Sequence, residues 1–347
     1  MRKKILIIIL SIVISTLVIF QGVSIIIYNV IFSHRYESVT YLMSNMDDFE
    51  NLERTRFEFN TKNDKKLVGY LYSTKDVEEK GLVVFAHGLG GGGQIGYLEI
   101  FNYLTRNGYY VFAYDATAND ESEGKEVGGL PQGIIDLDYA INFTKTIPQI
   151  KDLPLMLMGF SWGAYSVSNV LNYQENVKGV VAISGWNESL DLVGHYSNEY
   201  AGQVSKMSLP FVRIYETIKY GKYASSNAMD AFEKTEAKIM IVHSEDDKTV
   251  PIEYGYNKYY EQFKNDDRFI FKHYENKGHG NVFYSKEGAK YYNSLKDHIE
   301  QYIDSKNNVT QEEIVNFANQ IIDRNKLSNL LDYELFDEMI EFYNSCL

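Results

Sequence analysis

Six short, uninterrupted apolar runs are spread over residues 82–271 of the chain. Apolar runs of this length without polar alternation are typical of strands that are covered on both faces, as in a parallel sheet. The runs are Leu82–Ala86, Tyr109–Tyr114, Leu155–Met158, Val180–Ile183, Ile239–Val242 and Phe269–Phe271. Ahead of them, Arg56–Phe59 and Leu67–Tyr72 alternate between polar and apolar residues, which predicts a β-hairpin.

Segments with helical apolar spacing separate these runs. They are Gln94–Arg106, Gln132–Thr146, Trp162–Tyr173, Pro251–Phe263 and Lys286–Ile303. Strands that alternate with helices predict an α/β fold, in which a mostly parallel central sheet is flanked by helices through right-handed connections. We expect this domain to occupy residues 55–304.

Three segments lie outside the alternation. Residues 34–54 are polar to amphipathic and are expected to form a connector. The insertion Asn187–Glu236 is 50 residues long, and a structureless gap of that length is uncommon in a compact domain, so residues 187–236 are predicted to form a helical cap. Residues 305–347 show amphipathic spacing and are expected to form a helical C-terminal tail.

The N-terminal segment is apolar enough to cross a membrane. Ile5–Tyr28 contains 24 residues without a charge, and about 20 apolar residues of α-helix span a bilayer core. Three basic residues, Arg2–Lys4, precede it and only Arg35 follows closely, which favours a single-pass orientation with the body outside the cell membrane. We therefore expect residues 1–33 to be a transmembrane anchor. The alternative is a cleaved signal peptide and a secreted body, although this run is longer than such peptides usually carry.

The distribution of charge indicates which kinds of partner the chain can bind. The formal net charge is −13. Residues 1–36 contribute +4, which leaves 30 basic and 47 acidic side chains, a net charge of −17, on the rest. A body this acidic repels phosphate backbones, so no nucleic-acid partner is expected, and it gives no reason to expect a basic membrane-binding patch. The single cysteine, Cys346, excludes an internal disulfide framework and a cysteine-rich metal site.

The strongest chemical signal is Gly159-Phe160-Ser161-Trp162-Gly163. It is a G-x-S-x-G pattern between a predicted strand and a predicted helix, which is the setting in which this pattern presents a nucleophilic serine. The sharp turn would hold the Ser161 hydroxyl at the carboxyl edge of the sheet, close to the N–H groups of the helix N-terminus. The alternative is a glycine-rich turn that carries an ordinary surface serine.

A serine hydroxyl needs a base at neutral pH. His279 is our candidate, because Gly278 and Gly280 place it on a turn after the last predicted strand. His243 lies in a strand extension and is expected to bond locally, and His195 lies in the insertion, where it can at most line a pocket.

The base in turn needs an orienting carboxylate. Asp247 is the first choice and Asp246 the second, because both follow the strand Ile239–Val242 and a shift of one residue decides which faces the histidine. Glu188 and Asp191 are distant alternatives. The chain order serine, acid, histidine is that of the α/β-hydrolases.

An acyl-transfer site must also stabilise an oxyanion. The loop His87–Gly93 follows a predicted strand and is rich in glycine, which lets backbone N–H groups approach a ligand. We expect the N–H groups of Leu89 and Trp162 to be the donors. The same loop formally satisfies a dinucleotide-binding pattern, with Asp115 as its acidic partner, but that interpretation leaves Ser161, Asp247 and His279 unexplained.

On these residues the chain resembles the α/β-hydrolase superfamily, and in particular its bacterial lipase, esterase and serine-aminopeptidase-like members with a helical cap. The resemblance implies that Ser161 is the nucleophile, His279 the general base and acid, and Asp247 the orienting acid. It also implies Leu89 and Trp162 as oxyanion donors. Many such members carry D-x-R-G-x-G-x-S-x-G after the next strand, whereas Asp115–Gly124 keeps only its aspartate, serine and last glycine. Because that loop borders the site, the substrate cannot be carried over from the family.

These features predict a serine hydrolase that cleaves an ester, thioester or amide bond of a small-molecule, lipid or peptide substrate without a metal or organic cofactor. A carboxylic ester is preferred to a peptide, since Phe211, Tyr215 and Tyr220 in the insertion are compatible with an apolar acyl pocket. Two alternatives stay open. One is a non-catalytic surface protein that uses the cap for binding, and the other is an acyltransferase with the same three side chains.

Overall fold

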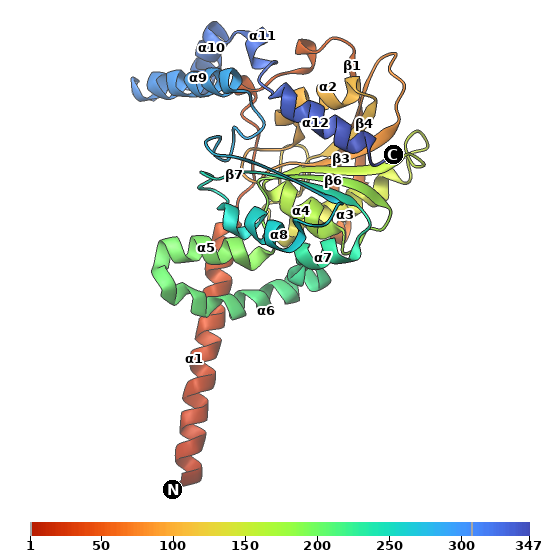
Figure 1. The fold of residues 1–347 in the computed structure, drawn as a ribbon. Helices are drawn as coiled ribbons and strands as arrows, with labels where there is room; N and C mark the ends of the chain where they lie inside the picture. The colour runs from red at the N-terminus through yellow and green to blue at the C-terminus, as the bar shows by residue number, and fades with distance from the viewer. Residues whose placement is uncertain (1, 307) are drawn as a thin grey trace.

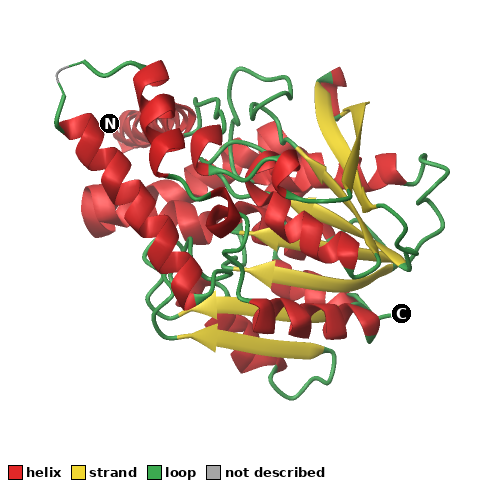
Figure 2. Ribbon diagram, turned by 90° about the horizontal axis from the view of Figure 1, so that it is seen from above, coloured by secondary structure: helices red, strands yellow, loops and turns green. Residues whose placement is uncertain are grey.

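The computed structural model describes residues 2–306 and 308–347. Its centre is an eight-stranded sheet in the order β1-β2-β4-β3-β5-β6-β7-β8 (Figure 2). Strand β2 is antiparallel to both of its neighbours, β1 and β4, and all other neighbouring strands are parallel. The strands are β1 Leu52–Asn60, β2 Lys66–Thr74, β3 Gly81–Ala86, β4 Tyr109–Tyr114, β5 Leu155–Phe160, β6 Val177–Ile183, β7 Lys238–Ser244 and β8 Phe269–Tyr274. The predicted hairpin and all six apolar runs are therefore strands.

Helices cover both faces of the sheet, as an α/β chain requires (Figure 1). They are α1 Arg2–Ile31, α2 Leu98–Arg106, α3 Pro131–Thr144, α4 Trp162–Val170, α5 Ser189–Ala201, α6 Leu209–Tyr220, α7 Ala228–Lys234, α8 Tyr256–Phe263, α9 Lys286–Asp304, α10 Gln311–Ile321, α11 Arg324–Leu327 and α12 Tyr333–Asn344. Helices α3, α4 and α8 pack on one face, and α2 and α12 on the other. The central strands β3 and β5 are almost entirely buried, which explains why their sequences lack polar alternation.

The last helix is part of the sheet's packing rather than of a separate tail. Phe336, Met339 and Phe342 of α12 lie in the same hydrophobic core as β3 and β5. The Tyr343 hydroxyl donates a hydrogen bond of 2.9 Å to the Leu157 carbonyl in the middle of the sheet. The packing of the predicted domain thus extends beyond residue 304, because the apolar face of α12 finds its cover on strands more than 150 residues away.

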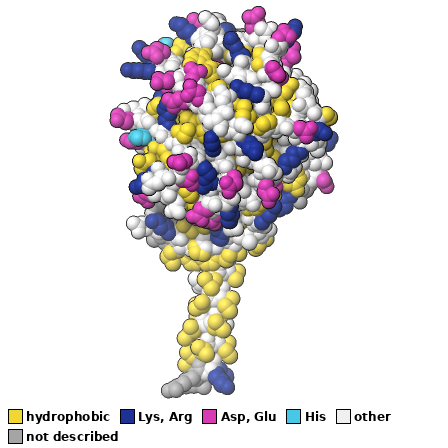
Figure 3. All heavy atoms as spheres, turned by 45° about the vertical axis from the view of Figure 1, so that its right-hand side comes forward, with side chains coloured by type: hydrophobic (Ala, Val, Ile, Leu, Met, Phe, Trp, Pro, Cys, Tyr) yellow, Lys and Arg dark blue, Asp and Glu magenta, His cyan; other side chains and the backbone are white. Residues whose placement is uncertain are grey.

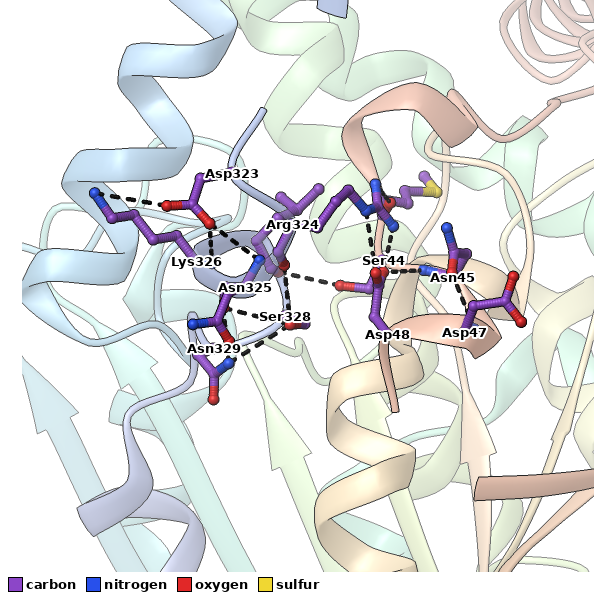
Figure 4. Close-up of polar contacts among 12 residues, drawn as sticks. Ser44, Asn45, Asp47, Asp48, Asp323, Arg324, Asn325, Lys326, Ser328 and Asn329 are labelled. Atoms are coloured by element: carbon purple, nitrogen blue, oxygen red, sulfur yellow. Dashed lines mark hydrogen bonds and ion pairs between the residues drawn. The ribbon is translucent and has the colours of Figure 1, made fainter. Parts of the chain in front are cut away.

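Helices α9, α10 and α11 form a small subdomain beside the sheet, with its own buried side chains such as Leu295, Ile299 and Ile314. The connector after α1 packs on it. Figure 4 shows the main polar contact, in which the Arg324 guanidinium binds the Asp48 carboxylate and also donates to the Met43 carbonyl at 3.2 Å. The N-terminal connector is therefore attached to the C-terminal third of the chain.

The predicted insertion folds as helices α5, α6 and α7, of which α5 and α6 project from the body on the side where α1 leaves it (Figure 1). Figure 2 looks down the axis of α1. Helix α1 is the one described helix long and apolar enough to cross a membrane; its span Lys3–Ile31 has a mean hydropathy of 2.7. A transmembrane anchor and a signal sequence both satisfy that criterion.

Candidate active site

Ser161 lies at the sharp turn between β5 and α4. Its backbone has φ 55° and ψ −114°, a left-handed conformation that is strained for a residue with a side chain. The turn is possible only because glycines occupy the positions two residues before and two residues after Ser161. A Cβ on Gly163 would lie 1.8 Å from the Ala86 carbonyl oxygen, and one on Gly159 would lie 2.3 Å from the carbonyl oxygen of Gly163. Close packing of β3, β5 and α4 thus holds the hydroxyl at the carboxyl edge of the sheet.

The imidazole of His279 lies between the serine and an acid. Its Nε2 is 2.9 Å from Ser161 Oγ, and its Nδ1 is 2.7 Å from Asp247 Oδ2. The ring packs on Phe160, with 5.0 Å between centroids, which limits its rotation. The structure therefore brings together three side chains that are separated by 86 and 32 positions in the sequence.

Asp247 lies in the loop after β7 with its side chain fully buried. One carboxylate oxygen, Oδ1, accepts hydrogen bonds from the N–H groups of Thr249 (2.9 Å) and Val250 (2.8 Å), which leaves Oδ2 for His279. Burial raises the pKa of Asp247, but hydrogen bonds from His243 and His279 outweigh burial and hold that pKa well below its ordinary range. The group is therefore charged at neutral pH and fixes a proton on His279 Nδ1.

Asp246, the second choice from the sequence, points elsewhere. Its Oδ1 accepts hydrogen bonds from the Ser244 hydroxyl (2.6 Å) and from the N–H of Gly278 (2.7 Å). The bond from Ser244 lowers the pKa of Asp246. This acid thus binds the backbone of the loop that carries the histidine, a role that the motif did not reveal. Its only signal in the sequence was its position within three consecutive acids, Glu245-Asp246-Asp247.

The other histidines and acids considered from the sequence do not reach Ser161. His243 is buried, and its Nε2 is 2.8 Å from the Val250 carbonyl oxygen, which is the local bond expected for it. His195 in α5 lies 3.6 Å from Glu199. Glu188 pairs with Arg213 within the cap, and Asp191 pairs with Lys258 of α8 at 2.8 Å. Glu188 thus stabilises the cap itself, and Asp191 binds the cap to the body.

The glycine-rich loop after β3 is held by buried polar groups. His87 Nε2 accepts from the Ala116 N–H at 2.9 Å, so its Nδ1 carries the proton and donates to the Gly88 carbonyl at 2.8 Å. Burial lowers the pKa of His87, which agrees with a neutral ring. The Gly88 N–H donates to the Tyr97 hydroxyl at 3.1 Å. Trp162 begins α4, so its N–H has no acceptor within the helix. The oxyanion role of Leu89 and Trp162 stays a prediction.

Two acids of the divergent Asp115–Gly124 loop also bind the glycine-rich loop. Asp115 Oδ1 accepts from the Gln94 N–H at 2.9 Å, and Asp120 Oδ2 accepts from the Gly93 N–H at 2.8 Å. Gly93 is required here, because a Cβ would lie 1.9 Å from Asp115 Oδ1. Asp115 is buried and directed at backbone, so it is not placed as the ribose partner that the dinucleotide interpretation needs.

The cap aromatics make different contacts from those expected of an acyl pocket. Phe211 stacks on Phe20 of α1, with 6.0 Å between centroids. The Tyr215 hydroxyl donates to Asn29 Oδ1 at 2.7 Å, and the Tyr220 hydroxyl donates to the Gly128 carbonyl at 2.5 Å. All three side chains are therefore engaged in binding the cap to α1 and to the body.

Comparisons with known proteins agree with this architecture. The family described as "Serine aminopeptidase, S33" matches residues 77–210. No curated protein is significantly similar to the chain in sequence. The crystal structure of the Pyrococcus furiosus esterase Pf2001 superposes with a TM-score of 0.55 at 19% identity, covering 78% of this chain and 99% of the esterase.

A second similar structure is the Pyrococcus horikoshii acylaminoacyl peptidase. It superposes with a TM-score of 0.52 at 17% identity, over 78% of this chain and 45% of the peptidase. With the sheet order and the turn at Ser161, these likenesses define the fold as a mostly parallel α/β sheet with a helical cap. The chain therefore has the α/β-hydrolase fold, and residues 77–210 within it are similar to the serine aminopeptidase family.

Proposed function

We propose that the protein is a serine hydrolase that cleaves an ester, thioester or amide bond through an acyl-enzyme on Ser161. The observation that carries this proposal is the continuous hydrogen-bonded chain from Ser161 Oγ through His279 to Asp247, at 2.9 and 2.7 Å. In it, His279 Nε2 takes the hydroxyl proton as Oγ attacks the carbonyl carbon, and the charged Asp247 stabilises the imidazolium that forms.

The remaining steps use the same groups. The N–H groups of Leu89 and Trp162 are proposed to receive the negative charge on the carbonyl oxygen. His279 then gives its proton to the leaving group, so that an acyl ester on Ser161 remains. Water attacks that ester, His279 removes its proton, and return of the proton to Oγ releases the acid.

Among substrates we put carboxylic esters ahead of peptides. This preference is supported by the contact between helix α6 of the cap and the apolar helix α1. If α1 is retained as a membrane anchor, the contact holds the site close to the bilayer, where amphiphilic acyl compounds collect. The structural relatives include an esterase and an acylaminoacyl peptidase, so esters and amides should be compared directly. Hydrolysis of p-nitrophenyl esters of graded length, beside aminoacyl anilides, makes that comparison.

A fluorophosphonate probe tests the catalytic proposal on the full-length protein. We expect one label per chain, and we expect Ser161→Ala to remove it while the melting temperature stays close to that of the wild type. Labelling that persists in Ser161→Ala, or a folded wild-type protein that takes no label, would contradict the proposal. The second result would favour the non-catalytic binding protein. Product analysis with added alcohols separates hydrolysis from acyl transfer.

We further propose that α1 is retained as a single-pass anchor, with the body outside. The support is that its last turns are built into the body: Tyr28 and the following Phe32 are 2% and 8% exposed within the main hydrophobic core. The Tyr28 hydroxyl also donates to Glu216 Oε1 at 2.7 Å, and Glu216 is buried. Cleavage as a signal peptide would remove these contacts. N-terminal sequencing of the mature protein tests this proposal.

A further inference from the structure

The cap carries an apolar stripe on its solvent side. Met207, Ile214 and Ile218 are 63%, 50% and 79% exposed, and the half-buried Phe211 lies between them at helical spacing. We call these four residues the cap stripe. The opposite side of α6 faces the body through Val212, Glu216 and Tyr220. A helix of a water-exposed cap would place polar residues at the stripe positions, so the stripe indicates an apolar partner.

The cap stripe begins directly beside the apolar helix α1. Phe20 stacks on Phe211, and the Gln21 side chain donates to the Phe211 carbonyl at 3.0 Å. Farther along, the hydroxyl of Tyr215 donates to Asn29. The start of α6 is therefore level with Phe20 and Gln21 of the anchor, and its middle is level with Asn29.

These contacts fix the depth of α6 relative to a bilayer that α1 crosses. About 20 residues at ~1.5 Å each cross a hydrocarbon core of ~30 Å, so a span that begins at Ile5 ends near Ser24. Phe20 and Gln21 then lie in the outermost turn of the core, and Asn29 lies above it. Because α6 contacts both levels, it lies at the boundary between the hydrocarbon and the headgroups.

The charges around the stripe suit that boundary. Residues 202–222 contain four basic side chains and one acid, Glu216, a net charge of +3 in a chain whose total is −13. The basic residues are Lys206, Arg213, Lys219 and Lys222. Arg213 is paired with Glu188 of the cap, so the three lysines supply the local excess of positive charge. Basic residues beside an apolar helix face are typical of helices that lie on anionic bilayers. Figure 3 shows hydrophobic side chains gathered where the globular body meets the projecting helix. The acidic composition of the body as a whole hides this local patch.

We propose that α6 lies on the lipid bilayer beside α1, with the cap stripe inserted at the outer boundary of the hydrocarbon core and the lysine side chains among the headgroups. The proposal rests on the retention of α1 as an anchor. One transmembrane helix leaves a body free to tilt and rotate, whereas a helix and a surface stripe together fix which side of the cap faces the lipid.

Depth-dependent fluorescence quenching tests this arrangement on the full-length chain. A single cysteine carries an environment-sensitive NBD label in a Cys346→Ser background, in nanodiscs of phosphatidylcholine and anionic phosphatidylglycerol, with and without nitroxide-labelled lipid. The stripe is probed with Ile218→Cys and the anchor with Ile9→Cys. Ile270→Cys is the matched control, since Ile270 is an exposed isoleucine whose neighbours Phe269 and Phe271 pack toward α8, so that it points to the sheet face opposite the cap side.

We expect the label at position 218 to lose fluorescence with a nitroxide near the headgroup, and the label at position 9 to lose it with a nitroxide deep in the acyl chain. The label at position 270 should lose none. Quenching at position 9 but not at 218 would overturn the lipid contact and leave the anchor proposal intact. Absence of quenching at both would overturn both proposals. An unquenched Ile218→Cys protein that forms disulfide-linked dimers on oxidation would assign the stripe to a second copy of the chain and also overturn the proposal.

Discussion

Asp246 and Asp247 are neighbours in the chain, but their carboxylates bind different partners. Asp247 accepts from the imidazole of His279, whereas Asp246 accepts from the Gly278 backbone. Asp246 lies in a tight turn after β7, which the Asp247 N–H closes by donating to the Ser244 carbonyl at 3.2 Å. Within this turn, a difference of one position separates the acid that binds the imidazole from the acid that binds its loop. The two residues therefore form a matched pair for mutation.

Asp247→Asn should lower kcat by roughly 10³- to 10⁴-fold, because an amide neither fixes the correct tautomer of His279 nor stabilises its cation. Asp246→Asn keeps an oxygen that can accept from Gly278 and should cost far less. Ester hydrolysis by the two purified variants makes the comparison. Equal losses, or an active Asp247→Asn protein, would show that the orienting acid is misassigned.

Asp115 should make stability depend on pH. Burial raises the pKa of Asp115 to about 7, whereas an unfolded aspartate has a pKa of about 4. The folded state then binds the proton on Asp115 more tightly, so the contribution of this group to stability is fully present below pH 4 and is lost as the pH rises through about 7. Asp115→Asn carries no charge, so its melting temperature relative to wild type should rise between pH 5 and pH 8. The exposed Asp152→Asn is the control. A difference that is independent of pH would contradict this ionisation.

At the scale of elements, the last turn of α1 and the whole of α12 pack on the body. Tyr28 of α1 and Phe32, which directly follows this helix, lie in the main core, and α12 covers the sheet from the other side. Both are amphipathic or apolar segments whose partners lie far away in sequence, Glu216 for Tyr28 and Leu157 for Tyr343. Local patterns show that such helices exist but not what they cover.

Removal of residues 1–33 should therefore destabilise the body rather than simply release it. This deletion takes away Tyr28 and Phe32 and leaves Glu216 without its hydroxyl donor from α1, and loss of one buried aromatic side chain typically costs about 3–5 kcal/mol. Removal of residues 1–19 keeps these contacts and is the control. We expect the protein without residues 1–33 to melt at a lower temperature than the protein without residues 1–19, both measured in the same detergent. Equal melting temperatures would mean that the end of α1 contributes nothing to the core.

Phe336→Ala in α12 should cost about 3–5 kcal/mol of unfolding free energy, because Phe336 is fully buried. Tyr333→Ala, at the exposed start of the same helix, should change little. Urea unfolding of the two variants measures the difference. Small losses in both would indicate that α12 is a dispensable tail.

For the whole molecule, the sequence predicted the features that depend on residues close together in the chain. The apolar runs marked the strands, and the pentapeptide around Ser161 marked the turn between β5 and α4. The structure places His279 beside that serine and Asp247 beside His279, because the carboxyl ends of parallel strands converge at one edge of the sheet. Their chemical roles stay proposals.

What the sequence did not predict depends on contacts between distant segments. Phe211, Tyr215 and Tyr220 looked suited to an acyl pocket, but in the structure they bind α1 and the Gly128 backbone. An aromatic side chain with a hydroxyl suits a pocket, a helix interface or a loop contact equally well. Only the arrangement of the cap, α1 and the body decides among these.

The loops that carry His279 and Asp247 are bound to each other through their backbones. The N–H of Lys277 donates to the Ser244 hydroxyl at 2.9 Å, and the N–H of Gly278 donates to Asp246 at 2.7 Å. These bonds hold the imidazole and its acid together without involving Ser161. We therefore expect the contact between His279 and Asp247 to persist even where the distance from His279 Nε2 to Ser161 Oγ varies.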